Sequence, residues 1–293
     1  MAEPGSWEPD SRLEGRRVVA SISGGKDSAA MSLWLTEQGV EHDRVFMDTG
    51  WEHRATYEYL RGELTRVIGP ITEIRADETL PEMAIRKGIF PSRLRRWCTE
   101  RLKVNPIKAH LAEMAERGID FVSAVGIRAA ESESRSKLTE WEWSDAFDCE
   151  IWRPILRWTE QDVIDIHKRH GLRPNPLYLL GASRVGCWPC IYAGKDEIRL
   201  MAAIDPGRVD EIRELEAAVT ESARVLIEGR GDTMEYGRTF FRERTKGEAW
   251  PIDRAVAWSK TAHGGRQYEL FAAQPGEQGC MRWGMCDTGD SDE

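Results

Sequence analysis

The sequence predicts an α/β protein built on a doubly wound parallel sheet. Three observations support this fold class: short β-branched runs suited to buried strands, a glycine-containing turn after the first run, and helical patterns between the runs. The first run is 17–22 (RVVASI), followed by the turn 23–28 and by apolar positions at helical spacing that stop near Gly39. Strand, turn, helix and strand is the order that a parallel sheet with crossover helices requires.

The later elements follow the same alternation. Asn105-Pro106 predicts the start of a helix, because proline suits the first helical position. Thr159 and Asp162 have the spacing of a capping box, and Gly171 is suited to end the helix that follows. The expected elements are a strand at 44–47, a helix at 52–68, a helix at 105–117, a strand at 120–125, a helix at 159–171, and helices at 195–204 and 209–227.

The length of 293 residues fits one large domain with an extension. We expect a flexible polar leader at 1–14, an α/β domain at 15–195 and a C-terminal helical or irregular extension at 196–293. No apolar run approaches the roughly 18 residues of a membrane span, and the N-terminus lacks a signal-peptide pattern. Membrane and secreted classes are therefore excluded, and a cytoplasmic location is expected.

The charge balance is uneven along the chain. There are 41 Lys+Arg and 50 Asp+Glu, so the net charge is −9 and the pI is about 5.4. This acidity argues against a protein that coats polyanions indiscriminately. The segment 86–103, however, contains seven basic residues and one acidic residue, a local charge of +6 that leaves −15 for the rest. It is either a solvated helix face or, as its Arg-Leu-Arg-Arg-Trp stretch favours, a focused anion-binding surface.

The turn after the first strand has the residues of a phosphate site. Two glycines allow a tight turn that presents backbone N–H groups, and the helix N-terminus adds partial positive charge. Lysine can neutralise phosphate, aspartate can hold Mg²⁺ and serines can donate hydrogen bonds. It is not a Walker A loop, and the alternative is an ordinary glycine-rich turn. The residues are Ser23, Gly24, Gly25, Lys26, Asp27 and Ser28.

This hexapeptide, SGGKDS, resembles the pyrophosphate loop of the N-type ATP pyrophosphatases. More narrowly, the chain is similar to the phosphoadenosine phosphosulfate (PAPS) reductase family and its sulfur-transferring relatives, including DNA phosphorothioation enzymes. The similarity covers roughly residues 15–195. Three further segments carry it: Phe46-Met47-Asp48-Thr49-Gly50, the basic stretch Arg96–Lys103 around Cys98, and Gly126-Ile127-Arg128-Ala129-Ala130-Glu131-Ser132 with Arg135.

The resemblance implies an adenine nucleotide alpha hydrolase-like fold, with ATP or a PAPS-like nucleotide as ligand and Mg²⁺ as its cation. It implies that loop 23–28, Asp48, Thr49, Gly50, Gly126 and Arg128 bind the nucleotide. As catalytic residues it indicates Lys26, Asp27, Arg128, Arg135 and Cys98.

Four of the six cysteines form two closely spaced pairs, Cys187/Cys190 and Cys280/Cys286. Four thiolates suit either Zn²⁺ or an iron–sulfur cluster, and the resemblance favours a [4Fe–4S] cluster. We expect these four as a closed ligand set beside a reactive Cys98. The alternatives are Cys98 with Cys187 and Cys190, or unligated buried cysteines. Cys149 matches no pair and is expected in the core.

The resulting functional prediction is an ATP-pyrophosphatase-type enzyme that adenylates an acceptor, with nucleic acid as a candidate, for sulfur insertion. A cysteine desulfurase or another sulfur donor would be its partner. The alternative is a sulfonucleotide reductase that releases sulfite, although the family's C-terminal Glu-Cys-Gly-x-His motif is missing. A third possibility is a nucleotide- or cluster-binding subunit of a complex, and a homo-oligomer is also compatible with the family.

Overall fold

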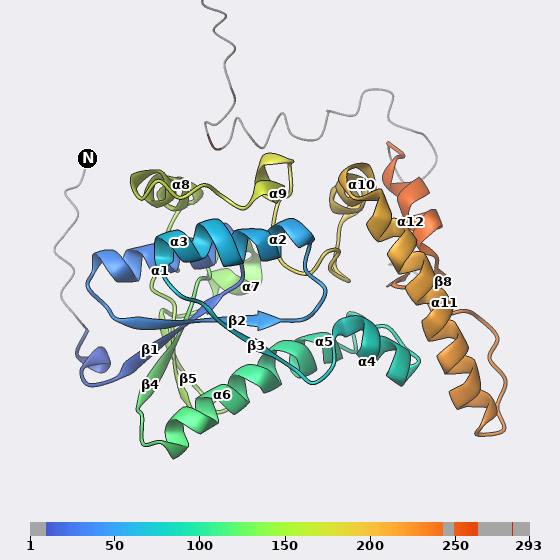
Figure 1. Ribbon diagram of the computed structural model, residues 1–293, viewed down its shortest axis with the longest axis horizontal. Coiled ribbons are helices and arrows are strands. Elements are labelled where there is room, and N and C mark those ends of the chain that lie inside the picture. Colours follow the sequence, from blue (N-terminus) through green and yellow to red (C-terminus); the bar gives the residue numbers. More distant parts are fainter. Residues whose placement is uncertain (1–9, 243–248, 263–282, 284–293) are drawn as a thin grey trace, which may run out of the picture. The chain divides into compact units, whose positions relative to one another are not determined.

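The computed structural model describes residues 10–242, 249–262 and Trp283 (Figure 1). The chain divides into two compact units, and each is built from segments distant in sequence. The sheet unit comprises 1–48, 54–74 and 104–176, and the helical unit comprises 49–53, 75–103 and 177–293. The predicted boundaries after residues 14 and 195 remain a prediction, and most of the leader lies outside the described residues.

A six-stranded sheet in the order β3-β2-β1-β4-β6-β5 forms the centre of the sheet unit. β1 pairs in parallel with both β2 and β4, β4 pairs in parallel with β6, and β5 is antiparallel at the edge. The predicted α/β class and its largely parallel sheet are therefore confirmed. The strands are β1 (Arg17–Ile22), β2 (His42–Asp48), β3 (Thr72–Arg75), β4 (Phe121–Val125), β5 (Trp141–Ser144) and β6 (Cys149–Trp152).

Helices cover both faces of this sheet, with α1, α3 and α8 on one side and α6 on the other (Figure 1). Successive residues of β1 face opposite sides: Val18 and Ala20 pack with residues of α1, whereas Val19 packs with Ile107 and Leu111 of α6. The helices of this unit are η1 (Ser11–Leu13), α1 (Lys26–Glu37), α2 (Arg54–Tyr59), η2 (Leu60–Leu64), α3 (Thr65–Ile68), α6 (Asn105–Glu116), η4 (Ala129–Glu131), α7 (Glu133–Ser136) and α8 (Glu160–Arg169).

The predicted helix start at Asn105 is confirmed, since α6 begins there with Pro106 in its first turn, but Asn105 does not cap it, because the residues before it are already helical. Val104 has helical dihedral angles (φ −66°, ψ −48°), and a π-helical segment, η3 (Glu100–Val104), leads into α6. Proline lacks the N–H that a regular α-helical turn requires. A wider π turn placed before Pro106 accommodates that missing donor, so the asparagine–proline pair marks an irregularity inside a helical stretch.

The helical unit has its own apolar core, in which aromatic side chains are prominent. Trp51 contacts Phe240, and Phe240 also contacts Phe90 and Phe241. The predicted helices near 195–204 and 209–227 are present as α10 and α11. The elements are α4 (Leu80–Lys87), α5 (Trp97–Thr99), α9 (Pro176–Leu179, whose first residue belongs to the sheet unit), α10 (Lys195–Ile204), α11 (Pro206–Glu228), β7 (Phe241–Arg242), β8 (Ala249–Trp250) and α12 (Ile252–Ser259).

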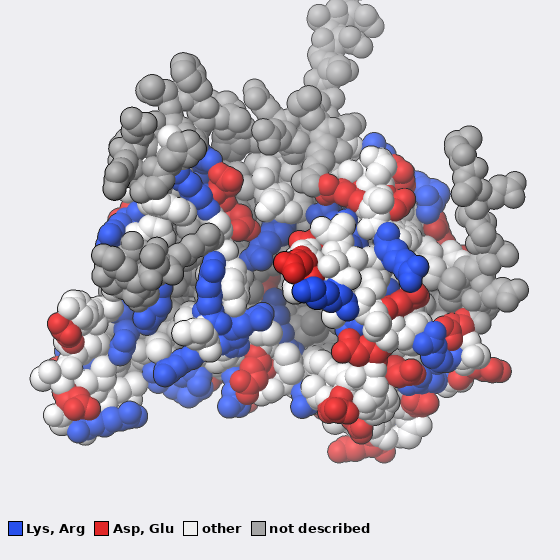
Figure 2. All heavy atoms as spheres, turned by 180° about the vertical axis from the view of Figure 1, so that it is seen from behind, with Lys and Arg blue, Asp and Glu red and all other residues white. Residues whose placement is uncertain are grey.

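Within the described residues, no helix combines the length and the apolar character needed to cross a membrane. The face shown in Figure 2 carries Lys and Arg side chains intermixed with Asp and Glu.

Candidate functional site

The glycine loop, Ser23–Ser28, connects the carboxyl end of β1 to the first turn of α1. Gly24 has φ +71°, and a Cβ atom there would lie 3.0 Å from a methyl carbon of Thr56. The hydroxyl of Ser28 donates to the carbonyl of Gly25 (3.0 Å) and accepts from the N–H of Ser23 (3.1 Å). These contacts hold the loop in a tight turn at the N-terminus of α1, where helix N–H groups attract anions.

Two buried cations and two carboxylates meet at this loop. Lys26 and Arg128 are 8% and 6% exposed. The Arg128 guanidinium donates from Nε to Oδ1 of Asp27, and Nζ of Lys26 lies 3.7 Å from Oδ2 of Asp27 and 3.7 Å from Oε1 of Glu160. Burying a cation is costly unless an anion compensates it. The site is thus charge-balanced and suited to rearrange around a phosphate.

The contacts of Asp27 determine whether its carboxylate can act as a Mg²⁺ ligand. Each oxygen of the Asp27 carboxylate faces a cation, Arg128 on one side and Lys26 on the other. Mg²⁺ requires carboxylate or phosphate oxygens as ligands. Both Asp27 oxygens face these cations, so Asp27 would become available as a Mg²⁺ ligand only when a phosphate replaces it as the partner of Lys26 and Arg128.

Gly126 brings the end of β4 against the glycine loop. A Cβ atom on Gly126 would lie 2.8 Å from both the Asp27 carbonyl oxygen and the Ser28 Cα. The strands concerned are neighbours, since Ser21 of β1 is paired with Val125 of β4. The carboxyl ends of adjacent parallel strands are where ligands bind in open α/β sheets, so the predicted Gly126 and Arg128 do join the loop.

Arg135 and Asp48, which are also predicted site residues, interact with side chains outside the glycine loop. Arg135, in α7, forms an ion pair with Glu131, whose carboxylate also accepts from the N–H of Arg128 at 2.9 Å. Asp48, at the end of β2, accepts a hydrogen bond of 2.6 Å from the Tyr57 hydroxyl. Both residues therefore belong to the sheet unit's site edge, and Arg135 reaches Arg128 through a shared carboxylate.

Thr49 and Gly50, expected to bind the nucleotide, belong to the helical unit. The Thr49 hydroxyl donates to the buried carboxylate of Glu52 at 2.8 Å and lies 3.8 Å from the sulfur of Cys187. Gly50 has φ +66°, and a Cβ there would clash with Thr79. The structure therefore shows Thr49 beside a cysteine, a contact that its sequence context does not indicate.

The helical unit also brings together three cysteines, which we call the cysteine cluster: Cys98, Cys187 and Cys190. All three interact electrostatically with Lys103, a partly buried residue whose pKa is raised, most strongly by Cys187. Burial raises the pKa of the Cys98 thiol and of the Cys187 thiol, and Lys103 acts in the opposite direction on both.

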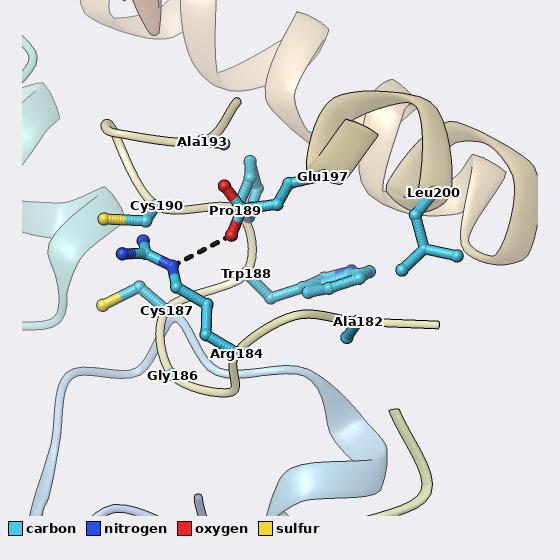
Figure 3. Close-up of a pocket in the computed structure, with 10 residues that line it drawn as sticks. All are labelled: Ala182, Arg184, Gly186, Cys187, Trp188, Pro189, Cys190, Ala193, Glu197 and Leu200. Atoms are coloured by element: carbon cyan, nitrogen blue, oxygen red, sulfur yellow. Dashed lines mark ion pairs between the residues drawn. The ribbon is translucent and has the colours of Figure 1, made fainter. Parts of the chain in front are cut away.

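A second cation, Arg184, lies in the pocket formed by the CxxC segment. Its Nε is 2.9 Å from Oε1 of Glu197, and its side chain hydrogen-bonds to Cys190. Figure 3 shows the guanidinium beside the sulfur atoms of Cys187 and Cys190. Cations near thiols favour the thiolate, which is both the nucleophile and the metal ligand.

The predicted metal ligands are only partly visible. Cys280 and Cys286 lie outside the described residues, so the closed set of four cysteines stays a prediction. In the described part of the chain, no group of three or more His, Cys, Asp or Glu residues is arranged to hold a metal ion. Cys149 is buried against α6 and its neighbours, as expected for a core residue.

Sequence reasoning misses Glu52, Glu160 and Arg184 as site residues, and it counts Lys103 only as part of a basic run. Nothing in their sequence context indicates these roles, although Glu160 lies within the capping box and Lys103 ends the basic stretch, because each reaches its site through tertiary packing. Spacing offers one signal, because Lys103 follows Cys98 by five residues in the same helical stretch.

Comparison with known proteins gives one family. The sequence model of the phosphoadenosine phosphosulfate reductase domain family matches residues 17–193 of this chain. A 37.8 kDa protein of Escherichia phage 186, described as uncharacterized, is 31% identical over 92% of this chain and 96% of its own length. The adenosine 5'-phosphosulfate reductase of Rhodococcus opacus is 30% identical over 50% of this chain and 58% of its own.

Among solved structures, the PAPS reductase of Candida auris in complex with phosphate is similar in fold. It has a TM-score of 0.48 and 18% identity, and the match covers 61% of this chain and 85% of that one.

Proposed function

Because the chain belongs to the phosphoadenosine phosphosulfate reductase family, we propose that it is an enzyme of sulfur chemistry that adenylates an acceptor for sulfur insertion. ATP would bind at the glycine loop, with its phosphates on the N–H groups of residues 24–28. The family match, residues 17–193, includes the loop, the β4 end and the CxxC segment.

The observation that carries this proposal is the buried pair of cations at the helix N-terminus. Lys26 and Arg128 are held close to the loop by Asp27 and Glu160, and a polyphosphate could replace these carboxylates as their partner. Preorganised cations of this kind stabilise the charge that develops on a transferring phosphoryl group. Arg135, released from Glu131, would extend the clamp.

The chemistry would run in two stages, adenylation and sulfur transfer. An oxygen of the acceptor attacks the α-phosphorus of ATP, forming an adenylated acceptor while the bond to pyrophosphate breaks. The terminal sulfur of a cysteine persulfide then forms a bond to the activated atom, and AMP leaves with the acceptor oxygen. A second cysteine thiolate attacks the inner sulfur, so that the S–S bond to the acceptor's new sulfur breaks and a protein disulfide forms, which a thiol reductant must reduce before the next turnover. The first displacement needs the cations of the sheet unit, and the sulfur transfer needs a persulfide and a second thiol such as the helical unit's cysteines could supply.

The cysteine cluster fits this second role. Lys103 and Arg184 offset thiolate charge at Cys187 and Cys190, which suits either a sulfur carrier loaded by a cysteine desulfurase or ligands of a [4Fe–4S] cluster. A cluster, when bound, would supply a site that delivers or holds sulfur. In our proposal Cys187, Cys190, Cys280 and Cys286 would hold it, with Zn²⁺ as the alternative metal, and Cys98 would be the adjacent reactive thiol.

Calorimetric titration with ATP tests the loop directly. We expect Lys26→Ala and Asp27→Ala to lose measurable binding, whereas Lys137→Ala, which removes an exposed lysine of the α7 C-terminus paired with Glu133, should bind as wild type. With a competent acceptor, AMP and pyrophosphate should form in equal amounts. Formation of ADP and phosphate, or unchanged binding in Lys26→Ala, would contradict the proposal.

A second candidate, sulfonucleotide reduction, is favoured by relatives that carry the name adenosine 5'-phosphosulfate reductase. Sulfite release from adenylylsulfate or PAPS, abolished by Cys280→Ser or Cys286→Ser, would support this function. Absence of sulfite together with AMP release from ATP would instead support adenylation.

A further inference from the structure

A short turn in the helical unit presents three arginines that no carboxylate in the described part of the chain neutralises. We call Ser92–Arg96 the arginine turn. Ser92 and Arg95 exchange backbone hydrogen bonds of 3.1 Å in both directions, and the Ser92 hydroxyl accepts a third from the Arg95 N–H at 3.2 Å. The backbone is therefore fixed, and Arg93 and Leu94 form its tip.

The three arginines of this turn are exposed, and two of them, Arg93 and Arg96, lie beside one aromatic ring. The guanidinium carbons of Arg93 and Arg96 lie 5.3 Å and 5.4 Å from the centre of the Tyr192 ring. Two like charges beside one ring repel each other, and a bound anion placed between them would relieve this repulsion. Arg95 adds a third exposed charge to the same four-residue stretch.

The rest of the molecule makes this cluster unusual. The chain has nine more acidic than basic residues, yet none of its described acids pairs with Arg93, Arg95 or Arg96. Some exposed arginines of the same unit, such as Arg213 and Arg224, are paired with carboxylates. Arg230 and Arg254 have no ion pair among the described residues but are far apart in sequence, so what distinguishes the turn is three such arginines within four residues. Cationic charge left unpaired in an acidic protein is available to a partner that brings its own negative charge.

The shape of the turn indicates what kind of anion it fits. A mononucleotide is normally enclosed in a concave pocket, whereas Arg93–Arg96 are exposed and Leu94 at the tip is 96% exposed. Three arginines on four successive residues give a high density of positive charge, which matches the dense negative charge of a polynucleotide backbone. An aromatic ring and an exposed apolar side chain beside them offer contacts to unstacked bases.

We propose that the arginine turn and Tyr192 bind single-stranded nucleic acid. Tyr192 lies two residues after Cys190, so a strand held there is adjacent to the cysteine cluster of the same unit. If the proposed function is correct, the strand is its sulfur acceptor; only this naming of the acceptor rests on that function. Binding of the strand itself requires neither nucleotide nor sulfur chemistry.

Fluorescence anisotropy of the full chain with a labelled single strand of about 20 nucleotides, longer than one typical binding site, tests this inference. Affinity should fall steeply between about 50 and 200 mM salt. In the triple variant Arg93→Ala, Arg95→Ala and Arg96→Ala, the slope of log K against log salt should decrease in magnitude by about 2, at about 0.7 per phosphate contact. Tyr192→Leu should weaken binding and leave that slope unchanged.

The matched control is the triple variant Arg224→Ala, Arg230→Ala and Arg254→Ala, which removes the same charge from exposed positions of the same unit. Its salt slope should equal that of wild type. Equal loss in both triple variants, tighter binding of a duplex than of the single strand, or equal competition by polyglutamate would overturn the inference.

Titration with ATP separates this inference from the proposed function. We expect the arginine triple variant to bind ATP as wild type and Lys26→Ala to bind the strand as wild type. Loss of ATP binding in the arginine variant would show that the turn serves the nucleotide, which would also overturn the inference.

Discussion

Gly126 has no side chain, and this allows the chain after β4 to pack directly against the backbone of the glycine loop. A Cβ atom there would lie 2.8 Å from two backbone atoms of Asp27 and Ser28, which cannot rotate away. Gly126→Ala should therefore displace the loop, cost about 1–3 kcal/mol in free energy of unfolding, and weaken ATP binding in a calorimetric titration.

Gly62, in the helical stretch η2, is the matched control because a Cβ there meets nothing within 4 Å. Gly62→Ala should leave ATP binding unchanged and raise stability by up to about 1 kcal/mol, through the better helix propensity of alanine. Equal ATP affinity in the two variants would show that contact with Gly126 does not position the loop.

His42 provides a pH-dependent prediction at the scale of a residue. Its ring accepts or donates hydrogen bonds of 2.8 Å with the Ser32 hydroxyl and the Val40 carbonyl, and burial lowers the pKa of His42 from 6.5 to about 4. Because the folded pKa lies below the unfolded one, its stabilising contribution is present above pH 6.5 and is lost as the pH falls towards 4.

These two pKa values give a loss of about 2 kcal/mol between about pH 7 and pH 5. Urea denaturation at both pH values measures the effect. His42→Gln should show a smaller pH dependence than wild type, while His110→Gln, on α6, should keep the wild-type dependence. A fall of equal size in His42→Gln would assign the pH effect to other groups.

Some site residues are predictable from the sequence and others are not. The glycine loop is predictable because its chemistry is local: glycines, lysine and aspartate stand together in six residues. The sequence neighbours of Thr49 assign it to the nucleotide, but the structure places its hydroxyl beside Cys187, 138 positions later. Such a contact depends on how distant segments pack, which spacing along one chain does not record.

Helices and strands also differ in whether they can be predicted from neighbouring residues or depend on pairing with distant segments. The capping box predicts the helix at 159–171, and α8 begins as expected because Thr159 and Asp162 exchange hydrogen bonds. The antiparallel edge strand β5 is not predicted: Trp141 and Trp143 alternate with polar residues, but the strand depends on pairing with β6. Local signals thus locate helix ends better than sheet edges.

The capping box of α8 is therefore a direct test of stability at the scale of an element. Thr159→Ala should cost about 1 kcal/mol, since it leaves an N–H of the first helical turn without its acceptor. Because Glu160 of α8 faces Lys26 at 3.7 Å, this variant should also weaken ATP binding slightly.

Thr159→Ser keeps the hydroxyl and is expected to retain wild-type stability. Thermal unfolding followed by circular dichroism measures all three proteins. If the serine variant were as unstable as the alanine variant, the methyl group of Thr159 rather than its hydroxyl would be the stabilising feature.

At the scale of the whole molecule, basic side chains form two groups that differ in their position and in their partners. The net charge of −9 keeps most of the surface unattractive to polyanions, while buried cations serve the glycine loop and exposed arginines gather at one turn. The two kinds of cation differ in partner: Lys26 and Arg128 are compensated by carboxylates, whereas Arg93, Arg95 and Arg96 have none among the described acids. The net charge calculated from composition averages these two groups, so it does not reveal that one is compensated by carboxylates and the other is not.

The proposed metal site would draw on distant parts of the chain, because its two predicted cysteine pairs are separated by 90 residues between Cys190 and Cys280. Removing any ligand of a four-cysteine site should release the metal. In protein purified without oxygen, we expect Cys187→Ser and Cys280→Ser to lose bound iron and its visible absorption. Cys98→Ser should keep both and lose only sulfur transfer, since we expect Cys98 beside the site as a reactive thiol.

Cys149→Ser is the matched control, because Cys149 is buried in the core of the sheet unit and should not affect iron content. Elemental analysis and absorption spectra of the four variants distinguish the ligand sets. Iron lost in Cys98→Ser but kept in Cys280→Ser would assign the site to Cys98, Cys187 and Cys190, whose shared interaction with Lys103 places them in one cluster. A colourless wild-type protein with stoichiometric zinc would rule out iron–sulfur chemistry and leave the cysteines with a structural or zinc-bound role.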